Sequence, residues 1–146
     1  MSTTTIASTS PADLVQAQLD AYNAHDVEAL VATYAADARQ YEYPDRLIAQ
    51  GAAALRERMA TRFEASRPQA QLLHRIAVGN TVIDHERIVN QTPDGPVVRE
   101  LIAIYEVDPT PAGGEGGHGD ATEGGNANGR IVSARFVFGE EVPAGK

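Results

Sequence analysis

The residues best suited to chemistry lie in a short stretch where one carboxylate stands between two tyrosines, Gln40-Tyr41-Glu42-Tyr43-Pro44-Asp45. Successive side chains of a strand point to opposite faces, so Glu42 points away from the face that carries Tyr41 and Tyr43. If one face lines a cavity, either the acid or the aromatic pair lies inside it. We interpret Glu42 as the inward group, around which the other elements build a pocket.

A second group of ionisable side chains is the run Asp84-His85-Glu86-Arg87, which falls in the middle of a predicted strand. Burial and neighbouring like charges raise the pKa of carboxyl groups, so several acids in one pocket separate into an acid and a base. Proton-transfer chemistry uses such a separation. The alternative is that this run forms a ladder of cross-strand pairs that faces solvent or a second subunit.

Composition limits the class of protein. A chain of 146 residues with 42% hydrophobic and 22% charged residues is typical of one globular domain. A net charge of −8 argues against binding to nucleic acid or to an anionic membrane surface. The chain has no cysteine, and its histidines show no metal-ligand spacing, so we expect no disulfide, no metal and no cofactor. No apolar run is long enough to span a bilayer. Residues 1–9 show no secretory-signal features and are expected to form a loose tail. The cytoplasm is therefore the default location.

The positions of these groups depend on three predicted helices. A serine cap followed by proline at Ser10-Pro11 starts the first helix, and Asp26 caps a second one. A third helix is predicted at about 51–66, with an apolar stripe that we expect to be buried. The stripe is Ala52, Leu55, Met59 and Phe63, and the arginines and glutamates between them are interpreted as a solvated face.

The remaining elements are strands, because the hydrophobic period changes from about 3.6 to 2 after residue 70. One strand is predicted at 38–43, before the third helix, and four more at 71–78, 81–91, 97–107 and 130–138. The glycine-rich segment 109–129 is interpreted as a flexible insertion in a hairpin, and 142–146 as a tail. The domain is therefore expected to cover 10–141.

This order of elements predicts an α+β fold. Three helices pack on the concave face of a cone-shaped, curved, mixed or antiparallel sheet of about five strands. Such a cone contains an internal cavity, which is a common place for a small-molecule ligand.

Four segments carry a family resemblance: 22–26 (YNAHD), 34–38 (YAADA), 51–56 (GAAALR) and 130–140 (RIVSARFVFGE). In this order and spacing the chain resembles the nuclear transport factor 2-like superfamily, which includes ketosteroid isomerases and SnoaL-like polyketide cyclases. The resemblance covers roughly residues 12–141, apart from the insertion. By analogy of fold it implies a homodimer.

The resemblance also implies roles for individual residues. The general base of the isomerases lies on the first strand, at the position of Glu42. The two hydrogen-bond donors of their oxyanion hole fall on Gln18, which can donate, and on Ala103, which cannot. Because losing one such donor costs about 10²–10³ in rate, a true ketosteroid isomerase is not expected.

The register between the predicted strands 81–91 and 97–107 decides which of their side chains enter the cavity. If Ala103 faces inward, as the resemblance implies, then Arg99, Leu101 and Tyr105 share its face, opposite Asp84 and Glu86. A one-residue slip would place His85 and Arg87 inside instead.

We therefore expect either an acid/base isomerase, cyclase or hydratase for a small apolar carbonyl or hydroxyl compound, or a non-catalytic ligand-binding or dimerisation module. The predicted catalytic residues are Glu42, Asp84 and Glu86. The predicted substrate-binding residues are Gln18, Tyr22, Tyr34, Arg99, Leu101, Ala103, Tyr105, Phe136 and Phe138. For Tyr22 and Tyr34 a role as core residues with bonded hydroxyls is the alternative.

Overall fold

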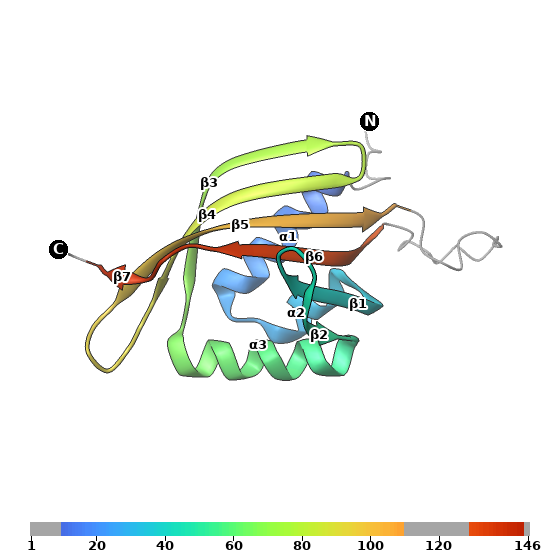
Figure 1. Cartoon of the computed structure of the whole chain (residues 1–146). Coiled ribbons are helices and arrows are strands. Elements are labelled where there is room, and N and C mark those ends of the chain that lie inside the picture. The colour runs from blue at the N-terminus through green and yellow to red at the C-terminus, as the bar shows by residue number, and fades with distance from the viewer. Residues whose placement is uncertain (1–9, 110–128, 145–146) are drawn as a thin grey trace, which may run out of the picture.

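The computed structural model describes residues 10–109 and 129–144 (Figure 1). The predicted tail at 1–9 and nearly all of the predicted 109–129 insertion lie outside the described residues.

The three predicted helices are confirmed as α1 (Pro11–Ala24), α2 (Val27–Ala32) and α3 (Ala52–Ser66). The predicted caps start the first two helices: Ser10 Oγ accepts from the amide of Asp13, and a carboxylate oxygen of Asp26 accepts from the amide of Ala29, both at 3.0 Å. These bonds satisfy amides that have no partner within a helix.

Within the described residues the sheet has seven strands, two more than expected. They are β1 (Tyr34–Glu42), β2 (Arg46–Gln50), β3 (Gln69–Val78), β4 (Thr81–Asn90), β5 (Val97–Asp108), β6 (Arg130–Phe138) and β7 (Val142–Pro143). Their order is β2-β1-β6-β5-β4-β3, with β7 paired to β5, and only β1 and β6 run parallel among the described strands. The additional strands are the short β2 and β7, so Val142–Pro143 belongs to the sheet rather than to a tail.

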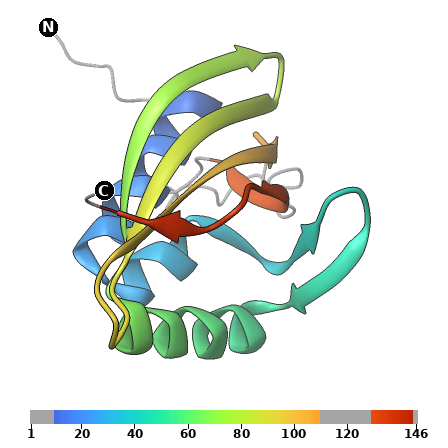
Figure 2. The same cartoon turned by 60° about the vertical axis from the view of Figure 1, so that its left-hand side comes forward.

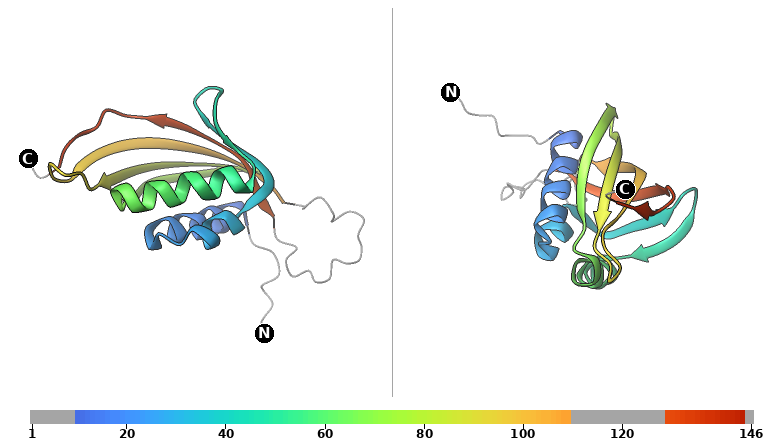
Figure 3. Two further views of the ribbon diagram at one scale, coloured as in Figure 1. Left: turned by 90° about the horizontal axis from the view of Figure 1, so that it is seen from below. Right: turned by 90° about the vertical axis from the view of Figure 1, so that its left-hand side faces the viewer.

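The sheet curves around the helices, which confirms the predicted α+β architecture. Figure 3 shows the helices on the concave side of the sheet, with α3 running across one end of it. The predicted stripe of α3 is buried, with Leu55, Met59 and Phe63 in the hydrophobic core. Burial of this stripe fixes α3 over the sheet and leaves a hollow between them.

The hairpin of β1 and β2 extends beyond this layer of helices (Figures 2 and 3). The pairing of the two strands shifts register after Gln40, opposite Ala49. The extra residue of this irregularity is Ile48 of β2, because Tyr41 lies opposite Leu47, whereas β1 keeps a regular register with β6 from Gln40 through Glu42. Tyr34, Ala38 and Gln40 of β1 are buried, and the end of the strand projects beyond the helices (Figure 3).

Candidate functional site

A cavity of about 220 Å³ lies between the concave face of the sheet and helices α1 and α3. Eight of the twelve predicted site residues line it. They are Gln18, Tyr22, Glu86, Arg99, Leu101, Tyr105, Phe136 and Phe138. The strand register that places them there is the predicted one, because Glu86 lies opposite Leu101 and Ile88 lies opposite Arg99. The slipped register is wrong, because His85 lies on the outer face of the sheet, where its Nε2 is 2.8 Å from Oε1 of Glu100.

Glu42 is not in the cavity, which corrects the central expectation from the sequence. Its side chain is 42% exposed and forms an ion pair with Arg46 across the β1–β2 hairpin, with 2.6 Å between Oε1 and Nη1. The physical reason is that the end of β1 lies beyond the layer of helices (Figure 3), so solvent rather than a helix covers Glu42. Gln40 is the residue of β1 that lines the cavity.

Three further predicted residues are buried beside the cavity without lining it. Ala103 is fully buried beneath the cavity wall. The hydroxyl of Tyr34 accepts a hydrogen bond from Gln40 Nε2 at 3.1 Å, which fixes the orientation of the Gln40 amide. Asp84 is held by Arg75 through two hydrogen bonds, of 2.6 and 2.9 Å, and its side chain has no exposed surface.

Glu86 is the acidic residue of the cavity wall. It comes from the middle of β4 and is 5% exposed. Its Oε2 atom is buried and, among the described residues, has no hydrogen-bond partner. Leaving a buried polar atom unpaired costs about 1–3 kcal/mol, so this oxygen is a site where a ligand or water that enters the cavity can form a hydrogen bond.

Burial raises the pKa of Glu86 from its ordinary value of 4.5 to about 7. The negative charge of the neighbouring Asp84 acts in the same direction, and Arg75 opposes it more weakly. Asp84 and Glu86 lie two residues apart on one face of β4, so their environments differ mainly through Arg75, which binds the first of them. Near neutral pH Glu86 can therefore both hold and release a proton.

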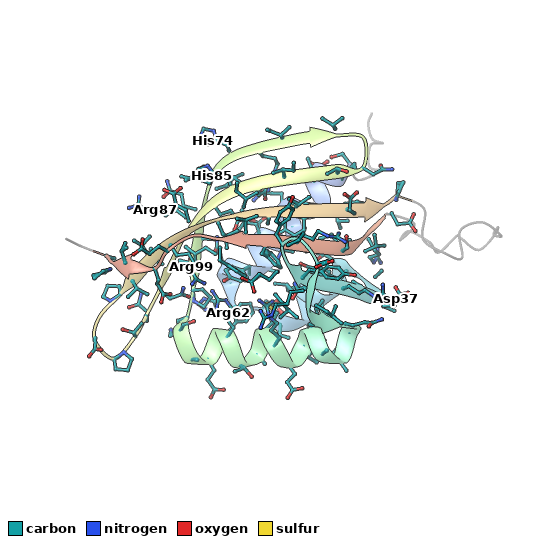
Figure 4. All side chains as sticks on the ribbon, in the orientation of Figure 1. Asp37, Arg62, His74, His85, Arg87 and Arg99 are labelled. Atoms are coloured by element: carbon teal, nitrogen blue, oxygen red, sulfur yellow. The ribbon has the colours of Figure 1, made fainter. Side chains whose placement is uncertain are left out.

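Two arginines of α3 line the cavity from the side opposite β4. Arg58 donates from Nη1 to Gln40 Oε1 at 2.6 Å, and its guanidinium lies 5.9 Å from the ring centre of Phe136. Arg62 donates from Nε to the Tyr22 hydroxyl at 3.0 Å. Figure 4 shows Arg62 on the side of α3 that faces the sheet.

The prediction that all arginines of α3 form a solvated face is wrong for these two. Arg58 and Arg62 follow Leu55 and Met59 by three residues, so they border the buried stripe. That spacing was the available signal for their placement. The other lining residues, which were not predicted as site residues, are Leu19, Gln40, Met59 and Ile88.

The remaining polar groups of the cavity are fixed by short contacts. The Tyr105 hydroxyl donates to Gln18 Oε1 at 3.2 Å, which leaves the amide nitrogen of Gln18 able to donate. Arg99 lies over the ring of Phe138, 5.1 Å from its centre, and Phe138 stacks on Phe136. The cavity thus combines an aromatic wall with one acid, three arginines and several amide or hydroxyl groups.

Within residues 10–109 and 129–144, no three histidine or acidic side chains lie close enough together to hold a metal ion. In the same ranges no helix is long and apolar enough to cross a membrane.

Comparison with solved structures gives the class of fold. The chain is similar to the epoxide hydrolase/cyclase-like enzyme SalBIII, which acts in pyran ring formation in salinomycin, with 18% identity, a TM-score of 0.68, and 88% and 90% of the two chains covered. It is also similar to a nuclear transport factor 2-like protein from Cytophaga hutchinsonii, with 14% identity, a TM-score of 0.63 and 94% of each chain covered. A third similar structure, from Catenulispora acidiphila, has a ketosteroid isomerase-like fold and contains trimethylamine, with 13% identity, a TM-score of 0.65, and 90% and 88% covered. The fold is therefore nuclear transport factor 2-like, as predicted.

A match to a family profile narrows the assignment within that class. The profile of the SnoaL-like domain matches residues 15–110, and the chain belongs to this family. No curated protein sequence matches the chain significantly.

Proposed function

We propose that this protein is an acid/base enzyme that moves a proton on a small carbonyl or hydroxyl compound, and that Glu86 is the catalytic residue. The observation that carries this proposal is one buried, incompletely hydrogen-bonded carboxyl group in the cavity wall. Its pKa of about 7 matches the value at which a general base works best near neutral pH.

The step that fits these groups is proton removal from a carbon next to a carbonyl. The carboxylate of Glu86 takes the proton, the C–H electron pair forms the C=C bond of an enolate, and the carbonyl π pair moves to oxygen. With a β,γ-unsaturated carbonyl, the dienolate takes the proton back from Glu86 at its γ carbon, the C=C bond moves into conjugation, and the carbonyl re-forms, which completes an isomerisation. Alternatively, the enolate carbon attacks a second carbonyl within the ligand, the ring closes, and the alkoxide formed there takes the proton from Glu86. Each route returns Glu86 to its starting state once the proton has left it.

Developing negative charge on oxygen requires hydrogen-bond donors. The free amide N–H of Gln18 is one candidate, and the Tyr22 hydroxyl is another, because Tyr22 accepts from Arg62 and so keeps its own proton to donate. These groups come from α1, on the opposite side of the cavity from the strands. They are positioning and stabilising groups, whereas Glu86 exchanges the proton.

A ligand-binding module without turnover is the second candidate. It is favoured by Ala103, which offers no donor at the second oxyanion-hole position, and by the aromatic wall of Phe136 and Phe138, which holds a ligand without chemistry. Because Ala103 offers no donor, catalysis by Glu86 has to rely on Gln18 and Tyr22 alone to stabilise the negative charge on the substrate oxygen.

Deuterium exchange separates the two candidates even when the final product of the reaction is not identified. The protein is incubated in D₂O with small enones, β-diketones and short polyketide fragments, and incorporation next to the carbonyl is followed by NMR. We expect exchange with the wild type, none above background with Glu86→Gln, and an unchanged rate with Glu42→Gln, the matched surface control. Binding detected by thermal shift, without exchange on any compound, would support the binding module instead.

The predicted homodimer and cytoplasmic location stay proposals. The convex face supports self-association, because β3 and β5 expose Ile76, Val78 and Ile102 there and β6 exposes Val137. Ile102 and Val137 lie directly opposite each other in the sheet, so the apolar side chains are neighbours across strands.

A further inference from the structure

Positive charge is concentrated in the cavity of a protein that is negative overall. The chain has a net charge of −8 and only 12 lysines and arginines. Three of these, Arg58, Arg62 and Arg99, line the cavity, where Glu86 is the one acidic residue among those that line it. The cavity therefore carries an excess of positive charge whether Glu86 is ionised or protonated.

No carboxylate of the described residues neutralises these three arginines. The arginine–carboxylate pairs in the described part of the chain join other arginines, namely Arg46, Arg56 and Arg75. The hydrogen-bond partners of Arg58, Arg62 and Arg99 are all neutral: Gln40, Tyr22, Asn90 and the carbonyl oxygen of Gly139.

Arg58 and Arg62 lie one helical turn apart on α3. Burial lowers the pKa of Arg58, and the charge of Arg62 lowers it further, so the two cations oppose each other in a partly dehydrated site. Like charges at this spacing are destabilising on a helix, and a desolvated charge without a counter-charge is costly. A bound anion would remove both costs.

We infer that the natural ligand is a small organic acid, whose carboxylate binds between Arg58 and Arg62 and whose apolar body lies along Phe136 and Phe138. The inference rests on the proposed function in that both use the same cavity. It does not require turnover, because a binding module with this cavity would have the same charge preference.

The geometry of the guanidinium groups fits a carboxylate. Each has five N–H donors, and Arg58 uses one of them in a hydrogen bond and Arg62 two. The free donors form the planar fork that binds carboxylates in a bidentate manner. Because α3 and β4 stand on opposite sides of the cavity, a ligand anchored at Arg58 and Arg62 directs its other end toward Glu86.

The test compares three probes of nearly the same shape that differ in charge: 1-naphthoate, 1-naphthamide and 1-naphthylmethylammonium. Isothermal titration calorimetry on the full chain measures their dissociation constants at low and high salt. We expect the wild type to bind the naphthoate at least about tenfold more tightly than the amide. Salt should weaken only the binding of the naphthoate, because it screens the charged contact.

Variants of Arg58 and Arg62 test whether these two residues cause the preference for a carboxylate. Arg58→Met and Arg62→Met should each lose about tenfold in affinity for 1-naphthoate and leave that for 1-naphthamide nearly unchanged. Arg56→Met, on the exposed side of the same helix, is the matched control and should bind as the wild type does. Glu86→Gln should keep the charge preference although exchange is lost, so the two proposals can fail separately.

Several results would overturn the inference. These are equal affinity for 1-naphthoate and 1-naphthamide, preference for the ammonium probe, no binding of any probe at millimolar concentration, or an effect of Arg56→Met as large as that of Arg62→Met. Tighter binding of inorganic phosphate than of 1-naphthoate would contradict the carboxylate assignment in particular.

Discussion

Asp84 and Glu86 stand two residues apart on the same buried face of β4, yet only Asp84 has an arginine bound to its carboxylate. Arg75 holds both oxygens of Asp84, whereas Glu86 keeps one oxygen without a partner at the cavity wall. The charge of the first carboxylate raises the pKa of the second. The strand thus carries two carboxyl groups in different environments, one paired with an arginine and one with a raised pKa.

The pH dependence of exchange follows from this arrangement. Glu86 must be ionised to accept a proton, and its pKa is about 7. We expect the rate of deuterium incorporation to rise as pH increases through about 7 and then to level off. A rate that is constant from mildly acidic to mildly basic pH, or an inflection near the ordinary value of a glutamate, would contradict the assignment of Glu86 as the base.

The same pKa predicts how stability depends on pH. Between 4.5 and about 7 the folded protein keeps the proton of Glu86 and the unfolded chain does not. The contribution of Glu86 to stability is therefore fully present below pH 4.5 and is lost as pH rises through about 7, by about 3 kcal/mol in total. We expect Glu86→Gln to raise the free energy of unfolding in urea by up to this amount at pH about 8.

A matched acid separates this effect from a general change of charge. Glu64→Gln removes one exposed carboxylate from α3 and should change the free energy of unfolding at pH about 8 by no more than about 0.5 kcal/mol. If Glu86→Gln were destabilising at every pH, the side chain would act as a structural group and the pKa argument would be wrong.

Arg75 is expected to matter for stability rather than for ligand binding. Its guanidinium satisfies the buried Asp84 and also donates to Gln16 Oε1 at 2.9 Å. Removing one partner of a buried ion pair typically costs about 3–5 kcal/mol, because the other charge is left unpaired. We expect Arg75→Met to lower the free energy of unfolding by that amount in a urea titration. A loss no larger than that of the exposed-pair variant Arg46→Met would show that Asp84 does not depend on Arg75.

The proposed dimer can be tested on the convex face. Introducing a charge among its exposed apolar side chains, as in Ile102→Glu, should convert a dimer to a monomer in sedimentation equilibrium, because a buried charge without a partner is costly. Leu47→Glu, in the exposed β1–β2 hairpin, is the control. A wild type that sediments as a monomer at all accessible concentrations would reject the dimer.

The sequence was sufficient for most of the fold because its signals are local. Helix caps at Ser10 and Asp26 and the change of hydrophobic period after residue 70 each depend on neighbouring residues. The missed strands, β2 and β7, are short, and their pairing partners are set by the tertiary structure. Short segments carry too little periodicity to be recognised.

The site was only partly predictable, for a different reason. The resemblance at Ala103, combined with the hairpin register, predicts Glu86 at the cavity, where it lies. The interpretation of Glu42 as inward is wrong, because alternation cannot tell where a strand leaves the cavity. The end of the layer of helices (Figure 3) decides that, and nothing in the residue types of β1 marks where this layer ends. Arg58 and Arg62 were assigned to the surface by their charge, although their spacing from Leu55 and Met59 places them at the cavity.

The most direct measurement of the central claim is a carbon-13 NMR titration of the side-chain carboxyl groups, with the Glu86 signal assigned by its loss in Glu86→Gln. We expect that signal to titrate with a midpoint near 7. A midpoint close to 4.5 would mean that Glu86 is an ordinary carboxylate, and it would remove the basis for proton transfer in this cavity.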